Sequence, residues 1–216
     1  RIYAMLTDNK ENMDYYLQHG IYKTERLDVR SFKFYADGAL GSRGACLLQP
    51  YSDKPEQQGF LLSKPGHFDS AAFRIINSKF QMNTHCIGDS AVKLILTTYE
   101  KNITKKRLTE SQIPSGITTR WRIEHFQVTT ASDITYLKLA GKIFDIIPSV
   151  QPTHATSDMY WAKDRLGPDR IKYAYAYNDL LKAAGMLALG TDFPVENINP
   201  MYTFYAAVAR KDLKGF

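Results

Sequence analysis

Four strand-like segments of this chain each carry a polar side chain of the kinds found in metal sites. The segments SFKFYADG, FQMNTHCIGD, RWRIEHFQ and MLALGTDFPVE contain Lys33, His85, His125 and Asp192. Each of these residues stands where an apolar run gives way to glycine, proline or a polar turn. The carboxyl ends of parallel strands share one edge of a sheet, and α/β barrels keep their chemistry at that edge. The series therefore predicts parallel strands with a common site at one end.

Strand and helix patterns alternate along the whole chain. The predicted strands cover residues 2–6, 29–36, 80–86, 119–126, 142–150 and 186–191. The predicted helices run up to about residue 19 and cover residues 67–78, 89–100, 130–140, 169–184 and 200–211. A glycine- and proline-punctuated segment, 37–66, is typical of a functional loop, and a polar excursion runs through Gly116. We predict one α/β domain over residues 1–216, with parallel strands.

The composition of the chain argues against nucleic acid and membrane as partners. The net charge is +6, but the 28 Lys and Arg residues are scattered, with one short cluster at 101–107. This distribution favours a solvated surface over a nucleic-acid footprint. No run of about 18 apolar residues is present, so no membrane-spanning helix is predicted. Two cysteines are too few for a disulfide framework, and the cellular compartment stays open.

Two histidines and an aspartate stand at corresponding strand ends. A divalent metal that activates water needs a few rigidly held nitrogen and oxygen ligands. A single histidine in such a place is more often structural, but His85 and His125 together with Asp192 favour a metal site. Asp192 itself fits two roles, a general base beside the metal or a carboxylate that stabilises the turn before Pro194.

Three further polar residues are candidates with open alternatives. Lys33 lies among aromatic residues, where an ammonium group needs a partner such as Asp37 or must extend outward to solvent. Arg43 is suited to clamp a carboxylate or carbonyl, because its glycine-rich surroundings match no phosphate-binding motif. His154 follows the fifth predicted strand and either faces substrate or is a neutral loop histidine.

Five collinear segments resemble the amidohydrolase superfamily. They are KFYADGALGSRGA (33–45), NTHCIGDSAV (83–92), RWRIEHFQ (120–127), PSVQPTHATSD (148–158) and GTDFPVENINP (190–200). The closest likeness is to the branch of metal-dependent hydrolases similar to N-substituted formamide deformylase. The resemblance extends from Ile2 to about Arg210. It implies an α/β fold of the TIM-like (β/α)8 barrel type.

The resemblance also implies a ligand set. His85 and His125 match the metal-binding histidines of the fifth and sixth barrel strands. Asp192 matches the aspartate of the eighth strand, which touches the metal and shuttles a proton. Lys33 matches the lysine of the fourth strand, which in such enzymes can be carboxylated and bridge two metals; that change would also remove the buried ammonium. The implied cofactor is one or two divalent ions, with zinc as the expected metal.

The sequence departs from the family pattern at its start. Family members carry a His-x-His pair at the end of the first strand, and this sequence contains none. Its six predicted strands correspond to the third to eighth of the family barrel, so we expect a partial barrel without the flanking β-sandwich domain. Open barrel edges are prone to pair with other strands. We therefore expect either a homo-oligomer formed through those edges or a distorted, open barrel.

The expected function is that of a fragment of a divalent-metal-dependent amidohydrolase. Such an enzyme hydrolyses a C–N bond in a small-molecule amide, formamide or cyclic amide. Asp192 would act as base and then acid, with His154 or Arg43 orienting the substrate. The fragment alone is expected to bind metal weakly and to be inactive. The alternative is a non-catalytic barrel domain that works as a binding or assembly module, and neither nucleic acid nor a membrane is an expected partner.

Overall fold

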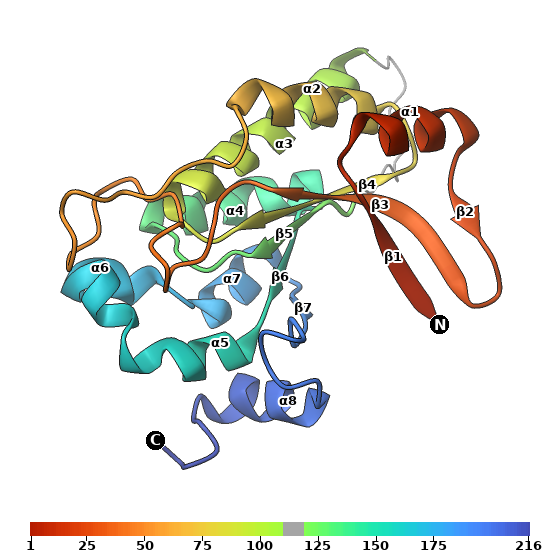
Figure 1. The fold of residues 1–216 in the computed structure, drawn as a ribbon. Coiled ribbons are helices and arrows are strands. Elements are labelled where there is room, and N and C mark those ends of the chain that lie inside the picture. Colours follow the sequence, from red (N-terminus) through yellow and green to blue (C-terminus); the bar gives the residue numbers. More distant parts are fainter. Residues whose placement is uncertain (110–118) are drawn as a thin grey trace.

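In the part of the chain that the structure describes, six parallel strands and one short antiparallel strand form a single curved sheet. The computed structural model describes residues 1–109 and 119–216, so part of the predicted polar excursion lies outside the described residues. The strand order is β1-β3-β4-β5-β6-β7, and β2 pairs with β3 in the antiparallel sense. The strands are β1 (Ile2–Thr7), β2 (Tyr22–Lys23), β3 (Leu27–Tyr35), β4 (Gln81–Cys86), β5 (Arg122–His125), β6 (Ile147–Val150) and β7 (Ala188–Leu189). The predicted fold class, a partial TIM-like barrel, is confirmed (Figure 1).

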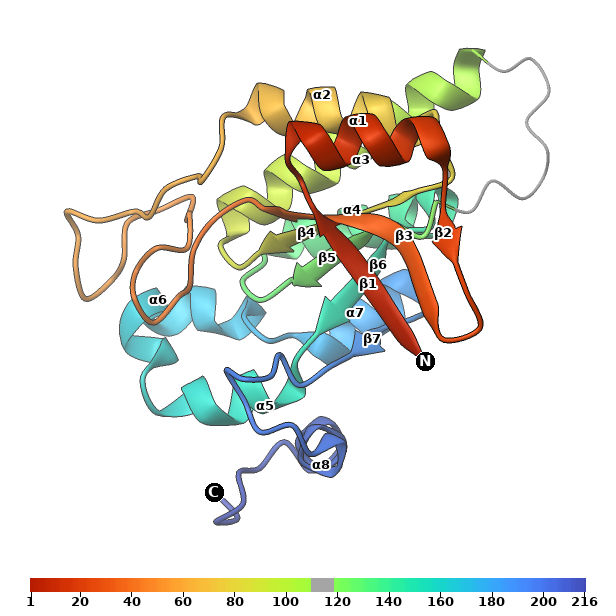
Figure 2. The same cartoon turned by 45° about the vertical axis from the view of Figure 1, so that its right-hand side comes forward.

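Helices follow the parallel strands, and side chains of α1, α2, α3, α4 and α7 pack together on one side of the sheet (Figures 1 and 2). The helices are α1 (Lys10–His19), α2 (Pro65–Ile76), α3 (Asp89–Thr109), α4 (Ala131–Phe144), α5 (Pro152–Ser157), α6 (Ala162–Arg170), α7 (Tyr177–Ala184) and α8 (Pro200–Ala209), with short 3₁₀ turns η1 (Asp158–Tyr160) and η2 (Ile171–Tyr173). Local signals fix several boundaries. The Asn9 side chain accepts a hydrogen bond from the Asn12 amide at the start of α1, and Gly185 ends α7 in the left-handed conformation.

The two faces of the sheet differ in chemistry, because side chains alternate along each strand. Phe32, Phe34 and Met82 are fully buried on the outer face, in a core that includes side chains of α2, α3, α4 and α7. Lys33 lies between the two phenylalanines in sequence and therefore points to the inner, concave face. The helices thus supply the apolar core, and the concave face is left for polar side chains.

Several predicted elements were wrong in their extent. The predicted helix 89–100 continues to Thr109 as α3, and the predicted strands 119–126 and 186–191 are shortened to β5 and β7. Residues 142–144 continue α4 rather than opening a strand, so β6 begins at Ile147. The predicted helix 169–184 is interrupted, because the Tyr175 amide leaves the helical pattern and donates to the Gln127 carbonyl at 2.7 Å. Tyr175 adopts a positive φ of 53° there. A long-range backbone hydrogen bond overrode the local helical pattern.

The long loop between β3 and α2 is anchored to α6 (Figure 1). Asp53 forms ion pairs with both Arg43 and Arg165, and the Arg170 guanidinium donates to the carbonyls of Gln49 and Pro50. Beneath these polar contacts, buried loop side chains form a second apolar cluster with Leu166. The loop therefore has a fixed conformation next to the carboxyl ends of the strands.

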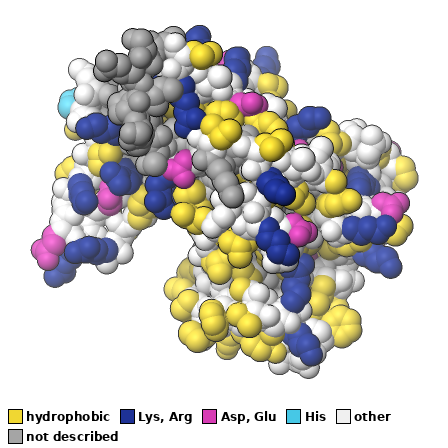
Figure 3. Space-filling model, turned by 180° about the vertical axis from the view of Figure 1, so that it is seen from behind, with side chains coloured by type: hydrophobic (Ala, Val, Ile, Leu, Met, Phe, Trp, Pro, Cys, Tyr) yellow, Lys and Arg dark blue, Asp and Glu magenta, His cyan; other side chains and the backbone are white. Residues whose placement is uncertain are grey.

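Helix α8 is apolar on nearly all sides. Thr203 and Ala206 are buried, whereas Met201, Phe204 and Val208 are exposed. The space-filling view from behind shows hydrophobic side chains gathered at this end of the molecule (Figure 3). A helix that is apolar all round is typical of one buried on several sides. Among the described residues, no helix has the length and apolar character needed to cross a membrane.

Candidate active site

A cavity of about 730 Å³ opens at the carboxyl ends of the strands. Five of the six residues predicted from the sequence line it. They are Lys33, His85, His125, His154 and Asp192. The remaining wall includes apolar and aromatic side chains, among them Leu40, Ile87 and Trp161. The structure thus brings together side chains that lie far apart in the sequence, from Lys33 to Asp192.

The three histidine rings lie next to one another. His85 is paired with Glu124 across β4 and β5, and His125 follows Glu124 with a positive φ of 71° that departs from strand geometry. The ring centroids of His85 and His125 are 4.4 Å apart. His154 lies on α5, directly after β6, and its ring stacks on His125 with a centroid distance of 5.8 Å. Three imidazoles from consecutive strand ends therefore face one region of the cavity.

Asp192 completes this group from the segment after β7. Its Oδ2 lies 3.7 Å from His154 Nε2. One ligand-type atom each of His125, His154 and Asp192 lies within 4.8 Å of the others. The sequence suggested His154 as a substrate-facing group, whereas the structure places it among the atoms that could hold a metal ion. His85 adjoins this trio through His125.

His85 and His125 are in the neutral state that a metal ligand requires. Burial, reinforced by the positive charge of Lys33, lowers the pKa of His85 to about 4. Burial and the neighbouring His85 lower the pKa of His125 well below its usual range. His85 Nε2, His125 Nδ1 and His154 Nε2 are all buried and lack a hydrogen-bond partner. Buried imidazole nitrogens without a hydrogen-bond partner cost free energy unless something binds them, so this set of residues fits a divalent ion.

Two members of the site have unusual backbones. His125 has a φ of 71° and Asp192 a φ of 58°. Few non-glycine residues adopt positive φ, although aspartate, asparagine and histidine tolerate it best. Such conformations persist where the surrounding structure fixes them, and they cluster at functional sites.

Lys33 extends into the cavity without the carboxylate partner considered from the sequence. Burial lowers the pKa of Lys33, and the negative charge of Glu124 opposes that shift. The Lys33 ammonium lies 5.0 Å from the centroid of the Tyr35 ring. Asp37 instead accepts hydrogen bonds from the amides of Cys46, Ile87 and Gly88. The lysine is therefore accessible from the cavity for chemical modification.

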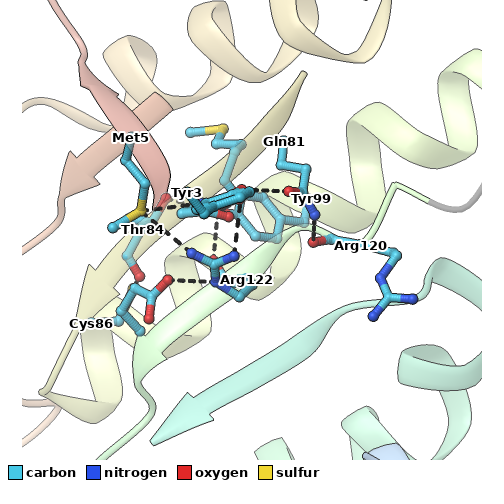
Figure 4. Close-up of polar contacts among 11 residues, drawn as sticks. Tyr3, Met5, Gln81, Thr84, Cys86, Tyr99, Arg120 and Arg122 are labelled. Carbon is cyan, nitrogen blue, oxygen red and sulfur yellow. Dashed lines mark hydrogen bonds and ion pairs between the residues drawn. The ribbon is translucent and has the colours of Figure 1, made fainter. Parts of the chain in front are cut away.

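A network of polar contacts on the concave face of the sheet lies next to the site (Figure 4). Arg122 Nε donates to Glu124 Oε1 at 2.7 Å, and its guanidinium lies over the Tyr3 ring. Tyr3 also contacts the Gln81 side chain through its hydroxyl group. These contacts join β1, β4 and β5 across the concave face. Since Glu124 precedes His125 directly, the network also fixes the end of β5.

Arg43 is not part of the cavity. Its Nη2 lies 2.8 Å from Asp53 Oδ2, and its Nε donates to the same carboxylate at 3.2 Å. The guanidinium is therefore occupied within the loop, and Arg43 is not among the residues that line the cavity. Sequence reasoning missed Gln127, Asp158 and Glu196, which do line it. Asp158 stands within the HATSD segment, four residues after His154, and this spacing was the available signal.

Gly41 and Trp161 lie against each other at the cavity wall. A Cβ atom added to Gly41 would lie 3.2 Å from Trp161 Cη2. We expect Gly41→Ala to displace the indole toward the cavity, to lower stability by about 1 kcal/mol, and to move tryptophan emission to longer wavelength. Trp121 is fully buried and serves as the unchanged reference. Gly190→Ala is the control, because a Cβ atom added there meets nothing within 4 Å, and it should leave the tryptophan emission unchanged. A shift of the emission in Gly190→Ala but not in Gly41→Ala would contradict the prediction.

Comparison with known proteins assigns the family. A model of the amidohydrolase family matches residues 3–215. The chain belongs to the amidohydrolase family. Among solved structures, this amidohydrolase chain is similar to two uncharacterized metal-dependent hydrolases. The protein from Pyrococcus horikoshii gives a TM-score of 0.81 at 29% identity, over 97% of this chain and 39% of the other. The protein from Pyrococcus furiosus gives a TM-score of 0.80 at 27% identity, over 96% and 40%.

A curated relative shows how much of a longer protein the chain covers. Protein LONG AFTER FAR-RED 3 of Arabidopsis thaliana is 32% identical over 199 residues, which is 92% of this amidohydrolase chain. The match covers 32% of the plant protein. The chain thus spans about a third of the length of this relative.

Proposed function

We propose that this amidohydrolase chain carries the later part of a divalent-metal site that hydrolyses a C–N bond in a small molecule. The observation that carries the proposal is the group of three imidazoles with unpaired buried nitrogens and one carboxylate around a single cavity. The Pyrococcus structures support it, because both are described as metal-dependent hydrolases. The resemblance to N-substituted formamide deformylase makes an amide, formamide or cyclic amide the substrate class.

Some residues of the cavity would bind the metal ion, and others would take part in proton transfer. His85, His125 and Asp192 would hold zinc, with His154 at ligand distance from the last two. Bound there, the ion would polarise a carbonyl group and make a water molecule more acidic. The accessible Lys33 ammonium is the group that carboxylation would convert into a further ligand. Carboxylation would show as the mass of one added carbon dioxide in the intact protein.

Asp192 is the proposed proton carrier. Burial raises the pKa of this carboxyl group, while the charges of His154 and Lys33 oppose the shift. A carboxylate of raised pKa accepts a proton from water more readily and can then release it to the leaving nitrogen. His154 Nε2 lies 3.7 Å from Asp192 Oδ2 without a hydrogen-bond partner, so it is free to donate to a substrate carbonyl in the cavity. Leu40, Ile87 and Trp161 would exclude water from the reacting groups.

Metal titration tests the proposal. We expect the chain to bind Zn²⁺ or Co²⁺, and His125→Ala to lose more affinity than the roughly 10- to 100-fold typical for an outer-shell partner. His19→Ala is the matched control, because His19 is exposed on α1 and bonds only the Tyr15 carbonyl among the described residues. Equal affinities of the wild type and His125→Ala would contradict the metal site and favour a binding or assembly module.

A further inference from the structure

The segment that carries Asp192 has little support from the rest of the fold. Strand β7 contains two residues, and the Asp192 side chain is 38% exposed. Phe193, Val195 and Ile198 are each more than half exposed. Beyond β7, the Gly190 amide donates to the Val150 carbonyl at 3.1 Å, which fixes only the start of the segment. Some other contact must therefore hold Asp192 near His154.

One side-chain hydrogen bond joins the two segments concerned. Ser157 Oγ donates to Glu196 Oε1 at 2.6 Å. Ser157 is the last residue of α5, three positions after His154, and Glu196 follows Asp192 by four positions. The bond therefore ties together the elements that carry His154 and Asp192. A carboxylate acceptor makes such a bond stronger than one between neutral groups.

The surroundings of Glu196 leave it few other constraints. Its side chain lines both the main cavity and a second cavity of about 370 Å³ next to α8. Within residues 1–109 and 119–216, no Lys, Arg or His forms an ion pair with it, and Ser157 is the side chain that donates to it. A side chain between two cavities is held mainly by its hydrogen bond, because packing against it is incomplete.

We propose that Ser157 and Glu196 are positioning residues for the metal site. Their hydrogen bond holds the Asp192 segment against α5, so that the Asp192 carboxylate and the His154 ring stay within ligand distance of His125. The inference rests on the proposed metal-binding function for its purpose, but the link itself exists in the metal-free chain. Breaking it should loosen the 190–198 segment without unfolding the barrel.

Hydrogen exchange of the metal-free chain tests the link directly. In Ser157→Ala we expect amide exchange in residues 190–198 to rise about 10-fold, with the exchange of β3, β4 and β5 unchanged. Ser157→Thr keeps the hydroxyl group and should restore slow exchange. Ser42→Ala is the matched control, since Ser42 Oγ bonds only the nearby Ala39 carbonyl among the described residues. Unchanged exchange of 190–198 in Ser157→Ala would overturn the proposal.

Zinc affinity tests the consequence for the site. We expect Ser157→Ala to weaken Zn²⁺ binding by about 10-fold, and Glu196→Gln, which keeps an acceptor oxygen, to weaken it less. Affinity equal to that of the wild type in Ser157→Ala would show that the link does not position the ligands. If the wild type binds no zinc, the proposed function fails, while the exchange experiment still decides whether Ser157 and Glu196 hold the segment.

Discussion

Replacing Gly88 with alanine is expected to destabilise the folded chain by about 3 kcal/mol or more. Gly88 lies in the turn between β4 and α3, three residues after His85. A Cβ atom added there would lie 2.0 Å from the Cys46 carbonyl oxygen and 2.5 Å from the Cys46 carbonyl carbon. Both are backbone atoms, so no side-chain rotation can relieve the overlap. Either the turn or the loop must move.

The surrounding hydrogen bonds make that movement costly. The Ser90 amide donates to the Cys46 carbonyl at 3.1 Å. The amides of Gly88 and Cys46 both donate to Asp37 Oδ2 at 2.8 Å. Separating the turn from the loop by even an ångström breaks several of these bonds, and each buried amide left without a partner costs about 1–3 kcal/mol.

Urea unfolding of two glycine variants measures this effect. Gly66 lies in the first turn of α2, and a Cβ atom added there meets nothing within 4 Å. Gly66→Ala should leave stability unchanged or raise it by up to about 1 kcal/mol, because alanine reduces the entropy of the unfolded chain. The difference in the free energy of unfolding between the two variants gives the cost of placing a Cβ atom against the Cys46 carbonyl group. Similar unfolding midpoints for both would show that the turn accepts a side chain.

The strand-end residues could be predicted because they follow from local patterns and one topological rule. Apolar runs that end in His85, His125 and Asp192 indicate parallel strands, and parallel strands bring their carboxyl ends to one edge. The rings of His85 and His125 do lie 4.4 Å apart. The direction of the strands predicted this shared edge, whereas the positive φ of His125 at the end of β5 had no signal in the pattern.

The contacts of Arg43 and His154 could not be predicted from the sequence pattern. The partner of Arg43 is Asp53, ten positions later in an irregular loop, and no periodic pattern relates them. His154 joins the metal-type group because α5 begins directly after β6 and turns its ring onto His125. Contacts made by loops and short helices depend on the tertiary fold, so the sequence pattern predicted the presence of these residues but not their orientation.

Asp37 illustrates the same limit for a buried charge. The sequence suggested it as a partner for Lys33, because the two are four positions apart at the end of a strand. In the structure it is 1% exposed and accepts three backbone hydrogen bonds. Burial raises the pKa of Asp37 to about 7, although the three amides favour the charged form. A side chain that satisfies backbone amides from two distant segments leaves no signature in the sequence pattern.

Removing the Asp37 carboxylate should therefore destabilise the chain by about 3 kcal/mol or more in Asp37→Ala, because three buried amides lose their acceptor. Asp37→Asn keeps one oxygen and should lose less. Asp169→Asn is the matched control, since Asp169 is exposed and pairs only with Lys172 among the described residues. It should change stability by less than about 0.5 kcal/mol. Equal urea midpoints for Asp37→Ala and the control would contradict the anchoring role.

The rate of thiol labelling distinguishes local loosening of the loop from global unfolding when Asp37 is replaced. Cys46 is partly exposed on the loop, whereas Cys86 is fully buried at the end of β4. If Asp37 anchors the loop, Asp37→Asn should speed the reaction of Cys46 under native conditions while Cys86 stays protected. Parallel acceleration of both thiols would indicate global unfolding instead. Because Asp37 Oδ1 lies 3.7 Å from His85 Nε2, a loosened loop would also disturb the surroundings of His85 in the proposed metal site. We therefore expect the stability of the chain and the position of His85 to depend on the same buried carboxylate.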